Sequence, residues 1–277
     1  MRIAVIGLGV MGGSFAARFR EMGHHVYGSD LNPETIQYAL ENGIIDEGGP
    51  DPDTYLKQAD LVLLCLYPTK LSGWLEEHQE KLRPGTLLME ISGVKGNITA
   101  PLQEQVRKDL QLLSIHPMCG RESKGIRFST PRIFDGANFI IVPQPTNTFE
   151  SVAQASALAK ELGCGTISVL SPDEHDEMIA FLSQLTHVIA VSLMNTHENS
   201  HLVAYTGDSF RDLTRIAKIN EDMWAELFLL NKEKLLEEIS DFEASIAHFK
   251  EALESEDADE MRRLFIQSTE RRKAFDR

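Results

Sequence analysis

Short apolar runs alternate with amphipathic stretches through the first 169 residues of the chain. The runs are rich in Val, Ile and Leu, as strands are when a parallel sheet buries both of their faces. We predict strands at residues 3–6, 25–29, 60–65, 86–91, 110–115, 139–142 and 166–169, and a helix at residues 149–162. Strands that alternate with helices indicate a Rossmann-like, doubly wound, mostly parallel α/β sheet domain over residues 1–169.

The strand-like runs cease after Val169, and apolar residues then recur at helical spacing to the end of the chain. A helix signal opens this second half, because Ser171 can cap a helix that begins at Pro172, and Glu174 can reach back to the cap. We predict an all-α domain over residues 170–277. A helical segment of this length usually buries one face against another body, so we expect a dimerisation domain and a homodimer.

The composition is that of a globular protein with an acidic surface, since 42% of the 277 residues are hydrophobic and the formal net charge is -15. Such a charge repels phosphate backbones and anionic membranes, so we predict neither a nucleic-acid nor a membrane partner. The chain begins at once with a predicted strand and has no apolar stretch of about 20 residues, which indicates a cytoplasmic protein. Cys65, Cys119 and Cys164 lack metal-ligand spacing, and no metal site is predicted.

A glycine-rich turn follows the first predicted strand. Gly7, Gly9 and Gly12 form the pattern G-x-G-x-x-G, in which glycine allows a tight turn and the close approach of a pyrophosphate. Asp30 ends the next strand, where its carboxylate can accept both ribose hydroxyls and repel a 2′-phosphate. We therefore predict bound NAD rather than NADP, with a purely structural turn as the alternative. The predicted cofactor-binding residues are Gly7, Leu8, Gly9, Val10, Met11, Gly12, Asp30, Tyr67 and Pro68.

His116 stands directly after the predicted strand at residues 110–115 and before Pro117. Its ring is then expected in a turn at the carboxyl end of the sheet, where open α/β folds bind their ligands. Imidazole suits the removal of a hydroxyl proton while hydride leaves the same carbon. Together with the glycine-rich turn, His116 predicts a dehydrogenase. A histidine that only caps the end of a strand is the alternative.

Two polar pairs in the second half are candidates for binding a substrate. Ser183 and His187 lie four residues apart and share one face of the first predicted helix. Arg211 and Arg215 are also one turn apart, and arginine can hold a carboxylate through two parallel hydrogen bonds. We expect a small anionic substrate that such arginines attract locally, against the field of the whole protein. A satisfied core histidine and ordinary surface ion pairs are the alternatives.

Four further residues carry polar or aromatic groups that could complete a site. Trp224 and Asn231 share a helix face, as core or interface residues. His175 lies at the capped helix start, where the helix dipole disfavours its charge, although a surface position is an equal alternative. Glu122 could orient or gate the site near His116, or it could be a solvated loop residue.

The order of these motifs resembles that of the prephenate/arogenate dehydrogenase family of tyrosine biosynthesis, over essentially the whole chain. The motifs are, in order, Gly7-x-Gly9-x-x-Gly12 with Asp30, Val94-Lys95-Gly96, His116-Pro117-Met118-Cys119-Gly120 with Glu122 and Gly125, Glu174-His175-Asp176, Ser183 to His187, Phe210-Arg211-Asp212-x-Thr214-Arg215-Ile216-Ala217, and Met223-Trp224 leading to Asn231. The resemblance implies the NAD-dependent oxidative decarboxylation of prephenate to 4-hydroxyphenylpyruvate. Arogenate or a specialised cyclohexadienyl acid is the alternative substrate.

The resemblance also implies roles for individual residues. His116 matches the histidine that takes the hydroxyl proton, Arg215 matches the arginine that binds a substrate carboxylate, and His187 matches a substrate-binding histidine. The catalytic set is His116, Ser92 and Glu122, and the substrate-binding set is His187, Arg215, Arg211, Ser183 and Trp224.

The chain departs from the family pattern near these residues. Gly93 stands where the family has a hydroxyl-binding serine before Val-Lys, and Ser92 lies one position earlier, which turns a strand residue to the opposite face unless the loop is remodelled. Gln184 replaces the first histidine of the family's Ser-His-Leu-Pro-His. The remaining departures are Thr186, Arg121 and Lys124. The two added cations beside Glu122 could alter the choice of substrate.

Two other functions stay open on the sequence. A 3-hydroxyacid dehydrogenase of the 6-phosphogluconate type shares the Gly-Leu-Gly-x-Met-Gly opening, but after Ser171 the chain lacks the expected lysine with an asparagine four positions on. A non-catalytic NAD-binding protein would explain the departures at Gly93 and Gln184 as lost chemistry, with the helical half serving only association. Turnover of prephenate with NAD separates these functions.

Overall fold

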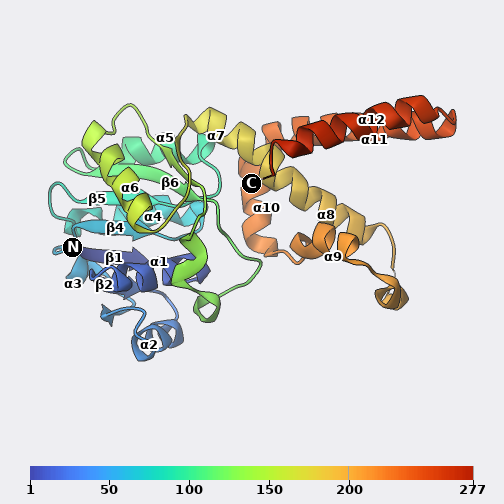
Figure 1. Ribbon diagram of the computed structural model, residues 1–277. Coiled ribbons are helices and arrows are strands. Elements are labelled where there is room, and N and C mark those ends of the chain that lie inside the picture. Colours follow the sequence, from blue (N-terminus) through green and yellow to red (C-terminus); the bar gives the residue numbers. More distant parts are fainter. Residues whose placement is uncertain (199, 277) are drawn as a thin grey trace. The chain divides into compact units, whose positions relative to one another are not determined.

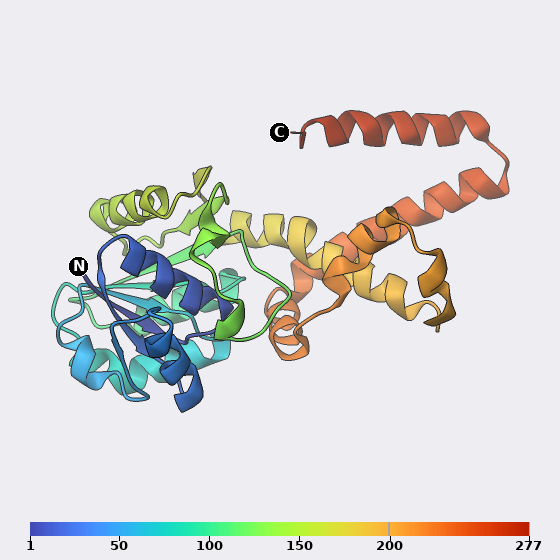
Figure 2. The same cartoon turned by 60° about the horizontal axis from the view of Figure 1, so that its bottom comes forward.

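The computed structural model describes residues 1–198 and 200–276, and of residue 200 only the backbone. The chain divides into two compact units, Met1–Asn231 and Lys232–Arg277. Figures 1 and 2 show the elements of each unit from two directions. The domain boundary predicted between residues 169 and 170 lies inside the first unit and stays a prediction.

The first unit contains an eight-stranded sheet with the strand order β3-β2-β1-β4-β5-β6-β7-β8. The strands are β1 (Arg2–Ile6), β2 (His25–Ser29), β3 (Glu47–Gly48), β4 (Leu61–Leu64), β5 (Leu87–Glu90), β6 (Gln111–Pro117), β7 (Phe139–Val142) and β8 (Ile167–Val169). Neighbouring strands run parallel except β6 and β7. The predicted Rossmann-like, mostly parallel α/β fold is therefore confirmed.

Helices cover both faces of this sheet (Figure 1). Helices α1 (Val10–Glu21), α2 (Pro33–Glu41) and α6 (Phe149–Glu161) pack on one core cluster, and α3 (Asp53–Leu56), α4 (Pro68–His78) and α5 (Gly96–Gln105) pack on the other. Three short 3-10 helices are η1 (Gln79–Lys81), η2 (Ile126–Phe128) and η3 (Pro131–Phe134). Successive side chains of β1 enter opposite clusters, with Ile3 in the first and Ala4 in the second. Burial on both faces explains why the strands read as apolar runs.

Strand β6 is longer than the sequence predicted. The expected end was Ile115, with His116 in the following turn, but β6 continues through His116 to Pro117. It continues because antiparallel β7 supplies partners beyond the parallel ladder, so that His116 pairs with Ile140. The prediction that His116 lies in a turn is therefore wrong.

A continuous helical run begins at the predicted cap. The hydroxyl of Ser171 accepts a hydrogen bond from Glu174 N, and the Glu174 carboxylate accepts one from Ser171 N, which forms the predicted capping box. Helix α7 (Pro172–Ile179) continues through a π-helical turn, η4 (Ala180–Leu185), into α8 (Thr186–Asn195). The remaining helices of this unit are η5 (Ser200–Tyr205), α9 (Asp208–Thr214), η6 (Arg215–Ala217) and α10 (Glu221–Leu230).

Among residues 1–198 and 200–276, the run Pro172–Asn195 is the one helix long and apolar enough to cross a membrane, with a mean hydropathy of 1.5. Its first turns contradict that role, because His175 and Asp176 are buried polar residues of the same unit. Its exposed apolar side chains are Phe181, Leu182, Leu193 and Met194. A helix anchored by buried polar groups at one end and apolar at its surface is typical of a protein interface.

The second unit is a helical hairpin of α11 (Lys232–Glu254) and α12 (Ala258–Lys273). The turn places Glu256 at a φ of 54°, and the side chain of Asp257 caps α12 by accepting hydrogen bonds from Asp259 N and Glu260 N. Phe249 and Phe265 pack across the hairpin, with ring centroids 6.0 Å apart.

Candidate active site

The glycine-rich loop between β1 and α1 makes a tight turn that brings the start of α1 close against the loop. Gly7 has a φ of +89°, and a Cβ on Gly12 would lie 1.8 Å from the Gly7 carbonyl oxygen. Gly9 faces open space, and it caps α1, whose first turn has no acidic residue and whose N-cap makes no side-chain hydrogen bond. The positive end of α1 is therefore available to a pyrophosphate.

Asp30 follows β2 and borders this loop. Its Oδ2 accepts a hydrogen bond from Leu8 N at 2.8 Å, and its Oδ1 accepts one from Asn32 N at 2.9 Å. The carboxylate is thereby fixed beside the loop, in the position suited to the ribose of a dinucleotide. Tyr67, which precedes α4, is partly exposed, and its hydroxyl accepts a hydrogen bond from Asn220 Nδ2 at 3.3 Å. Pro68 occupies the first turn of α4.

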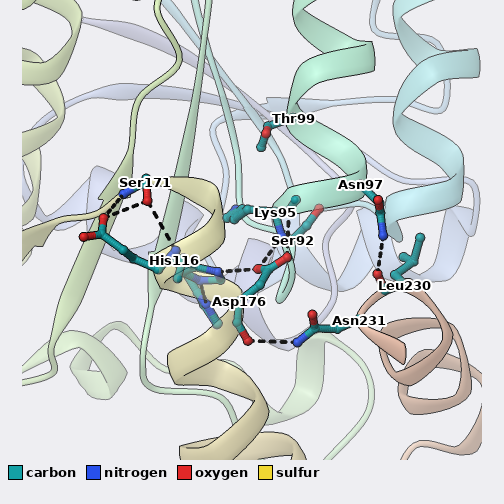
Figure 3. A network of polar contacts seen from close by, with 12 residues as sticks. Ser92, Lys95, Asn97, Thr99, His116, Ser171, Asp176, Leu230 and Asn231 are labelled. Atoms are coloured by element: carbon teal, nitrogen blue, oxygen red, sulfur yellow. Dashed lines mark hydrogen bonds and ion pairs between the residues drawn. The ribbon is translucent and has the colours of Figure 1, made fainter. Parts of the chain in front are cut away.

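His116 contacts a second histidine from the helical run. His116 Nδ1 lies 2.8 Å from His175 Nε2, and His175 Nδ1 lies 2.7 Å from Asp176 Oδ1. Figure 3 shows His116 on β6 close to the start of α7, which carries Asp176. His175 is fully buried, so its predicted alternative as a surface residue is wrong.

The Asp176 carboxylate caps helix α5. Its Oδ1 accepts a hydrogen bond from Lys95 N at 2.8 Å, and its Oδ2 accepts one from Gly96 N at 2.7 Å. Lys95 is the N-cap residue of α5 and supplies no side-chain cap of its own. A carboxylate from α7 thus satisfies the free N–H groups at the start of a helix in the sheet domain.

Lys95 and Glu90 form an ion pair that is wholly buried beneath His116. Lys95 Nζ donates to Glu90 Oε1 at 2.6 Å and to the Ile115 carbonyl at 2.9 Å, and both side chains are 0% exposed. Burial lowers the pKa of Lys95, and the Glu90 carboxylate opposes that shift. Glu90 Oε2 also accepts a hydrogen bond from Ser92 N at 2.6 Å.

The Ser92 hydroxyl is buried and has no hydrogen-bond partner within the described part of the chain. A buried polar group without a partner is costly unless a water or a ligand contacts it. Ser92 lies beyond the end of β5, and Figure 3 shows it close to Lys95. The strand alternation that the sequence argument assumed therefore does not apply at Ser92.

The surroundings of His116 keep its ring uncharged. Burial lowers the pKa of His116 well below its usual value, and the nearby His175 and Lys95 lower it further. Burial also lowers the pKa of His175, although Asp176 and Glu90 oppose this shift. A neutral imidazole with one donor and one acceptor nitrogen is the form that can accept a proton.

A second group of predicted residues gathers around His187. The rings of His187 and Trp224 lie with centroids 3.7 Å apart, and His187 Nδ1 donates to the Ser183 carbonyl at 2.8 Å, which leaves Nε2 free to accept. Arg215 forms an ion pair with Glu122. Burial is the main cause that lowers the pKa of His187, while the charge of Glu122 raises this pKa and the charge of Arg215 lowers it. The structure therefore brings these five residues together.

Arg211 does not join this group. Its guanidinium donates to Asp208 Oδ1 at 3.2 Å and to the Thr206 carbonyl at 3.1 Å, and it lines a hollow with Met194 and Phe210. The reason is that α9 ends at Thr214 and the chain then turns into η6, so Arg211 and Arg215 do not share one helical face. For Ser183, the backbone carbonyl rather than the hydroxyl contacts His187.

The departures from the family pattern also have contacts. Gln184 is buried, where its Nε2 donates to the Leu227 carbonyl at 3.1 Å and its Oε1 accepts from Asn231 Nδ2 at 2.8 Å. Asn231 Nδ2 also donates to the Asp176 carbonyl at 2.9 Å. Gly93 faces the same leucine, since a Cβ added there would lie 3.2 Å from Leu227 Cδ1.

Sequence reasoning overlooked the buried charges of this site. Glu90 appears there only as part of a predicted strand, and Lys95 and Asp176 appear only as parts of motifs. Their one local signal is that charged residues directly follow or interrupt apolar runs that are buried.

Comparison with known proteins identifies the family. Residues 15–168 match the model of the prephenate dehydrogenase nucleotide-binding domain, and residues 171–267 match that of the prephenate dehydrogenase dimerization domain. A prephenate dehydrogenase of Bacillus subtilis is 27% identical over 271 residues, which cover 95% of this chain and 73% of that protein. A cyclohexadienyl dehydrogenase of Zymomonas mobilis is 27% identical over 282 residues, covering 99% and 95%.

The fold resembles a solved structure over its whole length. The crystal structure of prephenate dehydrogenase from A. aeolicus, in complex with hydroxyphenyl propionate and NAD+, gives a TM-score of 0.91 at 28% identity and covers 100% of this chain and 98% of that one. With both domain models matched in order over most of its length, the chain belongs to the prephenate dehydrogenase family.

Proposed function

We propose that the protein is an NAD-dependent prephenate dehydrogenase that converts prephenate to 4-hydroxyphenylpyruvate and carbon dioxide. One observation carries the proposal within the family: a partly buried, neutral His116 has its Nδ1 occupied by His175, so that its Nε2 is left to accept a proton. Removal of a hydroxyl proton is the step for which an oxidation of this kind needs a base.

The residues around the glycine-rich loop fit a dinucleotide. Gly7 and Gly12 allow the tight turn, Gly9 leaves open space for a pyrophosphate, and Asp30 presents a fixed carboxylate for a ribose. NAD, when bound there, supplies the nicotinamide ring that accepts the hydride. The A. aeolicus relative, whose structure contains NAD+, supports the same cofactor for this chain.

The protein's own groups then orient the substrate and move its proton. His116 takes the proton of the ring hydroxyl. The Ser92 hydroxyl, which has no partner among the described residues, forms a hydrogen bond with the same substrate hydroxyl. Arg215 exchanges part of its contact with Glu122 for a substrate carboxylate, and the tilted, closely packed rings of His187 and Trp224 contact the substrate. Loss of carbon dioxide follows because it makes the ring aromatic, so catalysis rests on position and charge.

The protein acts as a homodimer in the cytoplasm. Support for the dimer comes from the matched dimerization domain and from apolar side chains that the helices of the first unit leave exposed. They include Phe181, Leu182, Leu193, Met194, Val203 and Phe210. The acidic net charge argues against a nucleic-acid or anionic membrane partner.

Arogenate is the second candidate substrate. The observation that favours it is a pair of exposed carboxylates beside the loop that carries Glu122, since Glu221 Oε2 lies 3.8 Å and Asp222 Oδ2 4.0 Å from Lys124 Nζ in that loop. Carboxylates suit the amino group that arogenate has in place of a keto group. The relative named cyclohexadienyl dehydrogenase is consistent with a broader substrate choice.

Steady-state formation of NADH from prephenate and from arogenate, each with NAD and with NADP, tests the proposal. We expect turnover with NAD, and 4-hydroxyphenylpyruvate as the product from prephenate, identified by mass spectrometry. A 3-hydroxy acid serves as the negative control. NAD binding without turnover of either cyclohexadienyl substrate would refute the proposal and favour a non-catalytic NAD-binding protein.

A further inference from the structure

A line of three side chains extends from His116 away from its free nitrogen. His116 comes from β6, whereas His175 and Asp176 come from the first turns of α7. His175 lies fifty-nine residues after His116 in the sequence. The two distances along the line are 2.8 Å and 2.7 Å. The line ends on a carboxylate whose two oxygens accept the backbone N–H groups of Lys95 and Gly96.

The hydrogen bonds determine the tautomers of both rings. Because the Asp176 carboxylate already acts as an acceptor on both oxygens, His175 Nδ1 must donate to it. A neutral His175 then has an acceptor at Nε2, so His116 Nδ1 must be the donor between the two rings. The proton of His116 is therefore on Nδ1, and its Nε2 carries a lone pair.

We propose that His175 is a positioning residue for His116: it holds His116 in the tautomer that can accept the substrate's hydroxyl proton, and it then takes over the Nδ1 proton. The inference rests on the proposed dehydrogenase function. The hydroxyl proton bonds to His116 Nε2, and the Nδ1 proton moves to His175 Nε2. His116 is then neutral again with its proton on Nε2, and His175 is an imidazolium that faces Asp176.

The charges that surround the two rings favour this second position. His116 is partly buried, and Lys95, from the loop before α5, lies close enough to disfavour a positive charge on it. The charge of Lys95 also disfavours a positive charge on His175. The carboxylate of Asp176 on α7, which His175 contacts, and that of Glu90 on β5 favour it. A positive charge is therefore stabilised by nearby carboxylates when it lies on His175, but not when it lies on His116.

Two substitutions separate holding from proton transfer. In His175→Asn the amide nitrogen can replace Nδ1 and still donate to Asp176, but nothing accepts from His116. In His175→Gln the longer side chain can place its carbonyl oxygen where Nε2 was, so that it holds His116 but cannot take its proton. His78→Asn is the matched control, because His78 also contacts a carboxylate, Asp53 at 2.8 Å, on α4 away from this line.

We expect kcat with prephenate and NAD to fall about 100-fold or more in His175→Asn, with KM and the affinity for NAD within about twofold of wild type. The kcat of His175→Gln should lie between those of wild type and His175→Asn, and the kcat of His78→Asn should match that of wild type. The acid limb of the pH profile belongs to the coupled histidines. It should move to lower pH in His175→Asn, because the charged His116 loses its acceptor.

A measurement without substrate tests the same inference independently of the proposed function. Nitrogen-15 spectra of histidine-labelled protein should show His116 protonated on Nδ1 in wild type and partly on Nε2 in His175→Asn. A wild-type His116 protonated on Nε2 would overturn the inference. So would a His175→Asn variant that keeps wild-type kcat and pH profile while wild type turns over prephenate. A wild type inactive on both substrates, with His116 on Nδ1, would instead overturn only the proposed function and support the tautomer assignment.

Discussion

The buried ion pair beneath His116 predicts a large and pH-dependent loss of stability in Glu90→Gln. The substitution keeps the size of the side chain and an oxygen that can accept a hydrogen bond, but it removes the charge opposite Lys95 Nζ, 2.6 Å away. Both side chains are 0% exposed, so water cannot replace the lost carboxylate. Removal of one partner from a buried pair costs about 3–5 kcal/mol.

The lysine sets an upper limit on this cost. Lys95 can lose its proton instead of remaining an unpaired buried cation. Because pH 7 lies roughly 3.4 units below the pKa of an unfolded lysine, and each unit costs about 1.4 kcal/mol, this deprotonation costs about 4.6 kcal/mol. Burial already lowers the pKa of Lys95 in the folded protein, and loss of Glu90 lowers it further. The unfolded chain then binds more protons than the folded one, so the stability of the variant rises with pH.

Urea unfolding measures this effect. Both tryptophans, Trp74 and Trp224, lie in the first compact unit and report its unfolding by fluorescence. We expect Glu90→Gln to lose about 3–4.6 kcal/mol at pH 7 and only about 1–2 kcal/mol near pH 9.4. Glu80→Gln, which removes an exposed partner 3.5 Å from Arg107, should lose less than about 1 kcal/mol at both pH values. A Glu90→Gln loss that stays below about 1 kcal/mol, or that grows with pH, would refute the reasoning.

Three further substitutions test the two ligand sites. Gly12→Ala places a Cβ 1.8 Å from the Gly7 carbonyl oxygen and should abolish NAD binding, as measured by calorimetry; wild-type affinity would contradict the assignment of the loop. Asp30→Ser removes the carboxylate beside Leu8 N and should reduce the preference for NAD over NADP roughly tenfold in steady-state kinetics, whereas an unchanged ratio would exclude Asp30 as its source. Arg215→Gln should raise KM for prephenate about 10- to 100-fold with a smaller change in kcat, since it removes a charged hydrogen bond of about 1.5–3 kcal/mol, and an unchanged KM would place the carboxylate elsewhere.

The fold was predictable because its signals are local. Seven of the eight strands are short apolar runs bounded by polar or turn residues, and β2 has the bounds that the sequence predicted. The two-residue strand β3 has no apolar run and was not predicted, because only its pairing with β2 defines it. The cap at Ser171 is equally local, because its partner Glu174 is three residues away. Strand β6 was predicted too short because its last pairs depend on β7, which no feature near His116 reveals.

The site was predictable only where a motif carried it. His116, His187 and Arg215 stand in patterns that point to their chemistry, and the structure places His187 and Arg215 near each other. The contacts that support His116 instead join residues far apart in the chain, such as Lys95 N with Asp176 Oδ1 over 81 positions. Spacing along the sequence holds no information about such pairs, because folding alone brings them into contact.

Two departures from the family pattern are explained by one shared neighbour. Gly93 faces Leu227 so closely that a Cβ would lie 3.2 Å from its side chain, and Gln184 donates to the Leu227 carbonyl. Gln184 also accepts from Asn231, which in turn donates to the Asp176 carbonyl. Gly93, in the loop before α5, and Gln184, in η4, therefore both pack against α10. Each departure therefore has a packing or hydrogen-bonding partner in the structure.

The buried polar groups beside that packing argue in the same direction. Glu90, Lys95, His116, His175 and Asp176 place five titratable side chains in one region, four of them at most 2% exposed. A protein that only bound NAD and associated through its helices would be as stable or more stable with apolar residues of similar volume there. Buried groups with shifted pKa values gather where chemistry requires them. The stability lost to these charges is therefore best explained by an active enzyme.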